Sequence, residues 1–232
     1  MAKVEQITAA QAAALVKDGM TVMVGGFMAN GTPECIIDAL VESGVKDLTI
    51  ICNDAGWGRK KNKQTGEYEG KARGVGKLIQ NGQVKKVIAS HVGLNPEFGD
   101  LYTEGAIELE LVPQGTLAER IHCGGAGLGG FYTPTGVGTV VADGKETKVI
   151  DGVEYILERP LHADVALIGG NVVDESGNTR YAGSERNFNV VMATAADTVI
   201  VRARQIVESG AIGADYVETP GIFVDYIVGG EA

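Results

Sequence analysis

Short hydrophobic runs alternate with segments of helical spacing along the first half of the chain. Alanine or aliphatic residues recur every three to four positions in three predicted helices, at residues 8–17, 33–43 and 75–80. The β-prone runs between them predict strands at residues 21–24, 48–52 and 84–90. Strands and helices in alternation form a parallel sheet with helices on its faces, so the pattern indicates an α/β fold.

The pattern changes after Glu104, where strands and turns predominate. Residues 107–112 alternate strictly between apolar and polar side chains, and a brief helix is expected at residues 116–121. Residues 124–138 contain seven glycines, which predicts a long structured loop. A hairpin within residues 140–157 should turn at Asp151-Gly152.

Three further strands are expected in the second half, at residues 163–170, 198–202 and 223–228. The chain shows no internal repeat and no linker. We therefore expect a single domain over residues 1–232, with an open, largely parallel sheet flanked by helices and an antiparallel elaboration in its second half.

Charge and hydropathy exclude several classes of protein. The formal net charge of −10 argues against nucleic-acid binding, because contact with the phosphate backbone requires a basic surface. The apolar runs are far shorter than the ~20 residues of a membrane-spanning helix, and the N-terminus has no apolar block typical of a signal peptide. We therefore expect a cytoplasmic protein that binds neither nucleic acid nor membrane.

Cysteine and histidine spacing gives no sign of a metal site. Cys35, Cys52 and Cys123 lie far apart without a C-x-x-C pair, and we interpret them as buried or unreactive thiols. The three histidines, at positions 91, 122 and 162, have no cysteine or carboxylate at ligand spacing. We expect them to be structural or surface residues, with no metal ion and no tightly bound cofactor.

One segment departs from the acidic character of the chain. Between Arg59 and Arg73 there are six basic residues and two acidic ones. We interpret this segment as a solvated surface loop, with contact to phosphate as the alternative.

A glycine-rich loop lies between the predicted strand at 21–24 and the predicted helix at 33–43. Residues 18–33 read D-G-M-T-V-M-V-G-G-F-M-A-N-G-T-P. The glycines allow the backbone to approach a ligand closely, and the helix that follows offers free N–H groups to negative charge. The same arrangement occurs in nicotinamide-binding domains, but here the spacing is not G-x-G-x-x-G and no acidic residue ends the next strand.

The whole of this string resembles the signature of family I CoA-transferase alpha subunits. Further blocks resemble the same family in the same order: N-P-E-F at 95–98, E-L-V-P-Q-G-T-L-A-E-R-I at 110–121, G-G-A-G-L-G-G-F-Y-T-P-T-G at 124–136 and R-N-F-N at 186–189. The similarity extends from about Val4 to Val228 and is greatest to bacterial acetate/acetoacetate/butyrate transferases. The basic segment 59–73 is the clearest departure, since it is longer than the family usually carries.

The resemblance implies the alpha subunit of a heteromeric enzyme that moves CoA between a short-chain acyl-CoA and a free carboxylate. In this family a glutamate of the beta subunit attacks the thioester and then carries CoA covalently, which gives ping-pong kinetics. The implied partners are a beta subunit, an acyl-CoA and a short carboxylic acid, with coenzyme A as a substrate. We expect a hetero-oligomer.

No nucleophile is expected in this chain. Residues 184–187, S-E-R-N, imitate the Ser-Glu-Asn-Gly motif that carries the glutamate in beta subunits. Glu185, however, directly precedes the R-N-F-N block and lacks the glycine that follows in that motif. We therefore reject Glu185 as the nucleophile.

Two amides and the glycine-rich loop are the candidate site residues. Gln114 is an uncharged donor between Pro113 and Gly115 that could meet a substrate carboxylate, and Asn53 ends a strand where open α/β sheets bind ligands. The resemblance assigns CoA or substrate binding to the loop residues Gly25, Gly26, Phe27, Met28, Ala29, Asn30 and Gly31. The alternatives are turn amides for Gln114 and Asn53, and a core residue for Phe27.

Other functions of an α/β fold stay open from the residues alone. They are a sugar-phosphate isomerase-like domain, a nicotinamide-binding domain and a non-catalytic regulatory subunit. The length of the acyl chain cannot be read either, because both subunits contribute walls to the pocket in the family that the chain resembles.

Overall fold

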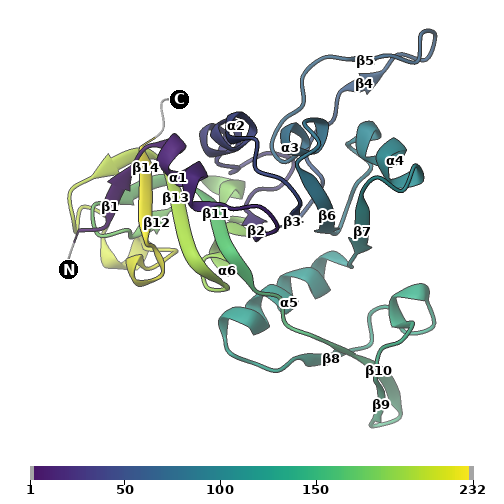
Figure 1. The fold of residues 1–232 in the computed structure, drawn as a ribbon. Coiled ribbons are helices and arrows are strands. Elements are labelled where there is room, and N and C mark those ends of the chain that lie inside the picture. Colours follow the sequence, from purple (N-terminus) through teal and green to yellow (C-terminus); the bar gives the residue numbers. More distant parts are fainter. Residues whose placement is uncertain (1–2, 230–232) are drawn as a thin grey trace.

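A large, mostly parallel sheet forms the centre of the molecule (Figure 1). The structure, a computed structural model, describes residues 3–229. The strand order is β1 (Glu5–Ile7), β14 (Tyr226–Gly229), β13 (Ala196–Val207), β11 (Ala163–Asp174), β2 (Thr21–Val24), β3 (Leu48–Cys52), β6 (Val84–Ala89) and β7 (Glu108–Leu111). Each neighbouring pair is parallel, and the short β12 (Thr179–Arg180) runs antiparallel beside β11. The predicted sheet is confirmed.

Helices cover both faces of this sheet (Figure 1). One face carries α1 (Ala9–Leu15), α2 (Glu34–Ser43), α3 (Gly76–Gln80) and α4 (Pro96–Thr103). The other carries α5 (Gln114–Gly125) and α6 (Asn189–Met192). None of the helices within residues 3–229 is long and apolar enough to cross a membrane.

Alternate residues of the central strands supply two separate cores. Ile50 and Leu167 belong to the cluster beneath α1 to α4, whereas Ile51 and Ile168 belong to the cluster beneath α5 and α6. Successive side chains of a strand point to opposite faces, so a sheet covered on both sides needs apolar residues at nearly every position. This explains the continuous apolar runs in the sequence.

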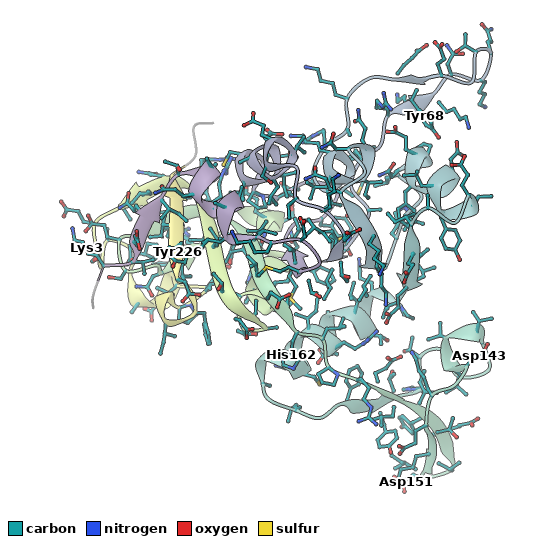
Figure 2. All side chains as sticks on the ribbon, in the orientation of Figure 1. Lys3, Tyr68, Asp143, Asp151, His162 and Tyr226 are labelled. Atoms are coloured by element: carbon teal, nitrogen blue, oxygen red, sulfur yellow. The ribbon has the colours of Figure 1, made fainter. Side chains whose placement is uncertain are left out.

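A small antiparallel sheet projects away from the main body, together with the 3₁₀ helix η1 (Val140–Ala142) (Figures 1 and 2). Its strands are β8 (Phe131–Thr133), β10 (Val153–Glu158) and β9 (Thr147–Ile150), in that order. The hairpin turns at Asp151 and Gly152, whose φ values are 49° and 79°. Positive φ at both positions is typical of the two-residue turn that joins twisted strands, so the predicted hairpin is confirmed.

The prediction of one long loop over residues 124–138 is wrong. Gly124 and Gly125 form the last turn of α5, and residues 131–133 form β8. A Cβ atom on Gly124 would lie 2.0 Å from the carbonyl oxygen of Leu161, and one on Gly125 would lie 2.0 Å from Thr194 Oγ1. These two glycines therefore allow close packing of a helix, which composition alone cannot distinguish from a loop.

Several boundaries also differ from the prediction. The helix expected at 116–121 is longer and begins at Gln114, and the strand expected at 223–228 begins at Tyr226, after the 3₁₀ helix η4 (Gly221–Phe223). Helix α4 was not predicted, although Asn95 caps it by accepting a hydrogen bond from the N–H of Phe98 at 3.2 Å. The remaining short elements are β4 (Lys60–Lys61), β5 (Tyr68–Glu69), η2 (Gly183–Arg186) and η3 (Ala214–Tyr216).

Candidate functional site

Three polar side chains meet at the carboxyl edge of the parallel sheet. Asn53 follows β3, Ser90 follows β6, and Gln114 begins α5 shortly after β7. Gln114 Nε2 donates a hydrogen bond to Asn53 Oδ1 at 2.7 Å, and Ser90 Oγ donates to the same oxygen at 3.1 Å. Neighbouring parallel strands end at the same edge, so residues far apart in the chain come together there. Both predicted amides therefore occupy one site.

Asn53 connects Gln114 to the glycine-rich loop through Asp54. Asn53 is buried, with 2% of its surface exposed, and its Nδ2 donates to Asp54 Oδ2 at 2.9 Å. The same Asp54 oxygen accepts the backbone N–H of Met28 at 2.8 Å, and Oδ1 accepts that of Gly56 at 3.1 Å. Buried networks with all members paired are rigid. Gln114 itself is exposed, and its amide nitrogen carries a second hydrogen that can be donated to a ligand.

The glycine-rich loop reverses direction in a tight turn. The backbones of Phe27 and Asn30 bond to each other in both directions, at 3.0 and 2.9 Å. Met28 and Ala29, between them, have φ values of 52° and 62°, a region that non-glycine residues rarely adopt. Trp57 Nε1 donates to the carbonyl oxygen of Met28 at 3.0 Å, which helps to hold the turn.

The two large side chains of this turn point outward. Phe27 is 39% exposed and Met28 is 42% exposed. The alternative that Phe27 is a core residue is therefore wrong. Exposed apolar side chains on a strained turn are typical of a surface that meets a ligand or a partner.

Asn187, within the R-N-F-N block, fixes one part of the loop. Its Oδ1 accepts the backbone N–H of Gly26 at 3.1 Å, and its Nδ2 donates to the carbonyl oxygen of Asn30 at 3.0 Å. The sequence identifies the block at 186–189 as a motif, but spacing along the chain does not predict its contact with the loop. The structure shows that it supports the loop.

Asn189 fixes the other part of the loop against β11. It is completely buried, its Nδ2 donates to the carbonyl oxygen of Gly31 at 3.1 Å, and its Oδ1 accepts the N–H of Gly169 at 3.0 Å. A Cβ atom on Gly25 would lie 1.7 Å from Asn189 Oδ1. Glycine is thus required at position 25 by the packing of the asparagine.

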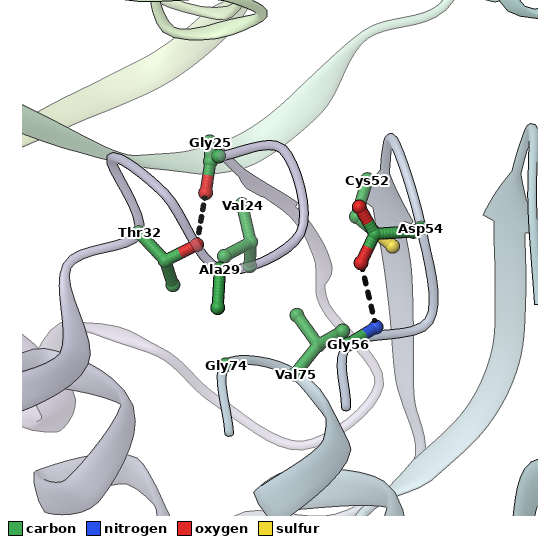
Figure 3. Close-up of a pocket in the computed structure, with 10 residues that line it drawn as sticks. Val24, Gly25, Ala29, Thr32, Cys52, Asp54, Gly56, Gly74 and Val75 are labelled. Carbon is green, nitrogen blue, oxygen red and sulfur yellow. Dashed lines mark hydrogen bonds between the residues drawn. The ribbon is translucent and has the colours of Figure 1, made fainter. Parts of the chain in front are cut away.

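A small cavity lies between this loop and the segment after β3 (Figure 3). Thr32 Oγ1 donates to the carbonyl oxygen of Gly25 at 3.0 Å on one side, and Asp54 holds the N–H of Gly56 on the other. Its volume is about 10 Å³. Such a space holds about one water molecule and is too small for an organic ligand.

Comparison with known proteins identifies the family. Residues 6–230 match the family described as Coenzyme A transferase. The chain belongs to this family. It is 50% identical over 226 residues to the acetate CoA-transferase subunit alpha of Escherichia coli (strain K12), covering 97% of both chains. It is also 50% identical over 212 residues to the alpha subunit of the acetoacetyl-CoA:acetate/butyrate CoA transferase of Clostridium acetobutylicum, covering 91% of both.

Solved structures share the CoA-transferase fold. Glutaconate coenzyme A-transferase from Acidaminococcus fermentans has a TM-score of 0.79 at 21% identity, covering 97% of this chain and 75% of that one. An acyl-CoA transferase from Escherichia coli O157:H7, solved as a thioester complex with CoA, has a TM-score of 0.82 at 23% identity. The match covers 97% of this chain but only 47% of that enzyme, so this chain spans about half of its length. These likenesses confirm the predicted fold.

Family membership confirms the resemblance seen in the motifs. It also sets aside the nicotinamide-binding and isomerase-like alternatives, because relatives at 50% identity over nearly the whole chain are CoA-transferase alpha subunits. The structure brings the glycine-rich loop and Gln114, which lie in two of the family motifs, to the same edge of the sheet.

Glu185 is engaged in contacts within this CoA-transferase chain. Its Oε2 accepts the N–H of Ala182 at 3.2 Å, and its Oε1 lies 3.3 Å from Arg204 Nη2. Its backbone oxygen accepts Asn189 Nδ2 at 2.6 Å. The side chain is only 14% exposed. These contacts hold η2 beside the loop. The rejection of Glu185 as a nucleophile stays a prediction.

The buried cysteine thiols are poor nucleophiles. Cys52 lies at the end of β3, where burial raises the pKa of its thiol well above the usual value and Asp54 raises it further. Burial also raises the pKa of Cys123, with a contribution from Glu119. The thiolate is the reactive form, so both thiols stay protonated near neutral pH. Cys35 is half-buried.

The three histidines are exposed on the surface of the molecule. His122 Nδ1 lies 3.1 Å from Glu119 Oε2. His91 lies just after β6, and His162 directly precedes β11. No group of three possible metal ligands occurs within residues 3–229.

The basic segment 59–73 forms the hairpin of β4 and β5, which docks on α4 (Figure 2). Arg59 Nη2 lies 2.5 Å from Glu97 Oε1, and Lys61 pairs with Asp100. The hydroxyl of Tyr68 donates to Asp100, and burial together with this acidic partner raises the pKa of Tyr68 to about 12. Most of the other residues in the segment are exposed, as the surface-loop interpretation predicts.

Proposed function

We propose that this chain is the alpha subunit of a heteromeric, cytoplasmic CoA-transferase and acts as a single domain over residues 1–232. The enzyme moves CoA between a short-chain acyl-CoA and a free carboxylate of the acetate, acetoacetate or butyrate class. The observation that carries the proposal is the hydrogen bond from Gln114 to Asn53, which holds an exposed amide donor at the carboxyl edge of the sheet. The names of the relatives at 50% identity support the substrate class.

The covalent chemistry is assigned to a glutamate of the beta subunit, following the family pattern. Its carboxylate attacks the carbonyl carbon of the acyl-CoA, and the thiolate of CoA leaves as a mixed anhydride forms. The thiolate then attacks the glutamyl carbonyl, which releases the first carboxylic acid as its carboxylate and leaves CoA bound to the glutamate as a thioester. An incoming carboxylate reverses these two steps, so the kinetics are ping-pong.

Gln114 is the residue of this chain that we assign to the reacting carboxylate. Negative charge is concentrated on oxygen atoms while two carboxyl groups are held together, and a fixed neutral donor stabilises that charge without reorganisation. Asn53 is 2% exposed, and its bond to Gln114 gives it a positioning role within this chain. Its predicted contact with substrate stays a prediction.

The turn of the glycine-rich loop is assigned to the CoA or acyl group. Gly25, Gly26, Ala29, Asn30 and Gly31 shape the loop, while Phe27 and Met28 present apolar surface. The short acyl chain and the methylene groups beside the thioester sulfur are apolar, and this surface complements them. Binding energy from the distant part of CoA can then be used at the reacting atoms.

The experiment is co-expression of this chain with the protein encoded beside its gene, followed by exchange assays between acetyl-CoA and butyrate or acetoacetate. We expect exchange only when both chains are present. Intact-protein mass spectrometry after acyl-CoA is added without an acceptor should show CoA attached to the partner and none attached to this chain. Robust turnover by the single chain, or CoA attached to it, would contradict the proposal.

A further inference from the structure

A second hollow lies on the β11 and β13 side of the glycine-rich loop, whereas Gln114 and Asn53 lie on its β3 side. Its volume is about 430 Å³, within the range of about 300–1,000 Å³ that is usual for small-ligand sites. Loop residues 28–32 form one wall, and Gly169 and Gly170 lie at its base. Three arginines, Arg73, Arg202 and Arg204, line it as well.

Arg202 and Arg204 lie on the face of β13 that elsewhere packs into the core. Ile200 of β13 is completely buried in the cluster beneath α1 to α4, and alternation places Arg202 and Arg204 on the same face. β2 ends at Val24 while β11 and β13 continue beyond it, and the hollow lies where these two strands extend past β2. The glycine-rich loop turns over this part, since a Cβ on Gly169 would meet the carbonyl oxygen of Gly31 at 2.3 Å.

The acidic residues of the hollow already have cationic partners. Glu34 Oε2 lies 2.7 Å from Lys77 Nζ, a charge contact without the geometry of a hydrogen bond, and Glu185 Oε1 lies 3.3 Å from Arg204 Nη2. These pairs account for one of the three arginines. The charge of the other two is not balanced by the acidic residues that line the hollow.

Arg73 and Arg202 are the two arginines left over. Neither forms an ion pair with another residue of the described range 3–229. The Nε atom of Arg202 is buried and has no hydrogen-bond partner within that range. A buried donor without a partner is unfavourable, and more so on a charged group. An anion in the hollow would satisfy it.

We propose that this hollow binds a phosphate-bearing group that carries about two negative charges, held by Arg73 and Arg202. Guanidinium groups bind phosphate oxygens through pairs of parallel N–H donors, and two of them from separate elements suit a dianion with oxygens on several sides. The position beside the loop makes the phosphates of CoA one source, which rests on the proposed function. Free inorganic phosphate or pyrophosphate is the other source.

The first experiment is calorimetric titration of the full chain, at fixed ionic strength, with CoA, pyrophosphate and pantetheine, which lacks phosphate. CoA and pyrophosphate should bind and pantetheine should not. Arg202→Gln and Arg73→Gln should each weaken binding at least tenfold, and Arg202→Lys should restore part of it. Arg180→Gln, which alters an exposed arginine stacked on Tyr216 outside the hollow, should leave binding unchanged.

Competition distinguishes the two sources of phosphate. If CoA displaces pyrophosphate, the CoA phosphates occupy the hollow; if pyrophosphate binds and CoA does not displace it, the hollow takes a free anion. Absence of phosphate binding, or binding unaffected by both Arg73→Gln and a folded Arg202 variant, would overturn the inference. Thermal unfolding of each variant establishes whether it is folded.

Activity of the assembled enzyme separates this inference from the proposed function. If CoA occupies the hollow, Arg73→Gln should raise KM for acyl-CoA with little change in KM for the carboxylate. An active enzyme that binds phosphate independently of both arginines would refute the proposed phosphate site and leave the proposed function unaffected. Arginine-dependent phosphate binding by a complex that exchanges no acid would refute the proposed function and support the phosphate site.

Discussion

The amide nitrogen of Gln114 donates to Oδ1 of Asn53 at 2.7 Å, although 61 residues separate the two in the sequence. The bond joins the start of α5 to the end of β3, with β6 between β3 and β7 in the sheet. Ser90, at the end of that middle strand, donates to the same oxygen. The buried Asn53 Oδ1 therefore accepts hydrogen bonds from a residue at the end of β6 and from the first residue of α5, which follows β7. These bonds fix the orientation of the exposed glutamine.

The first prediction concerns Gln114. Gln114→Ala should lower kcat of the assembled enzyme about 100-fold, the usual effect of losing one donor to a developing charge. The free energy of unfolding should fall by no more than about 1 kcal/mol, because Gln114 is exposed and Ser90 still donates to the Asn53 oxygen when the glutamine is removed. Steady-state kinetics and urea unfolding measure the two effects.

Gln114→Glu is the matched control for this prediction, because it keeps the shape and removes the donor. It should lower kcat at least as strongly as alanine, since a carboxylate repels both the substrate carboxylate and Asn53 Oδ1. An unchanged kcat in Gln114→Ala would remove the residue from the site.

The strand ends could be placed from the sequence, and the bonds between them could not. Apolar runs located β2, β3 and β6, and the rule that ligands bind at the carboxyl ends of parallel strands selected Asn53. The bond to Gln114 depends on strand order and on where α5 begins, and neither is encoded in a local pattern. Tertiary packing decides such contacts.

The contacts of the two asparagines that support the loop could not be predicted from the sequence either. Asn187 and Asn189 were recognised only as letters of a family block, because their partners lie about 160 residues away in the chain. Composition predicts a loop at Gly124 and Gly125, since it does not show whether a glycine turns the chain or allows a neighbouring element to pack closely.

The second prediction concerns Gly25. Gly25→Ala should destabilise the chain by roughly 1–3 kcal/mol, the usual cost of overpacking, because its Cβ would overlap Asn189 Oδ1. The displaced asparagine would also release Gly31, so activity of the assembled enzyme should fall. Urea unfolding and exchange assays measure both.

Gly99→Ala is the matched control. Gly99 lies within α4, and nothing stands within 4 Å of where its Cβ would be. Alanine is favoured over glycine in a helix by about 0.8–1.0 kcal/mol, so this variant should be at least as stable as the parent. Equal stabilities for the two variants would show that Asn189 does not require glycine at position 25.

The third prediction concerns thiol reactivity. Cys52 is 2% exposed and burial raises the pKa of its thiol, so it should resist alkylation by iodoacetamide at pH 8 in the folded chain. Half-buried Cys35 should react first, and Cys52 should react only after unfolding in urea. Peptide mass spectrometry locates the label. Rapid labelling of Cys52 in the folded chain would contradict the packing at the end of β3.

The last prediction concerns Asp174 and stability in acid. Asp174 is completely buried, which by itself raises the pKa of its carboxyl, but hydrogen bonds outweigh burial and lower the pKa below the usual 3.8. They come from the side chain of Asn178 at 3.0 Å and from the backbone N–H groups of Gly210, Asn178 and Ser176 at 3.1, 3.0 and 2.9 Å.

A carboxyl whose pKa is lower in the folded state stabilises the fold fully above its unfolded pKa, near 3.8, and this stabilisation is lost as pH falls through the lower folded value. Asp174→Asn should therefore reduce the free energy of unfolding at pH 7 and flatten its decline below about pH 4. Asp197→Asn, at an exposed position, should keep the parent profile. Urea unfolding between pH 2 and pH 7 measures this, and parallel acid profiles for the parent and Asp174→Asn would show that the three backbone donors do not stabilise the carboxylate.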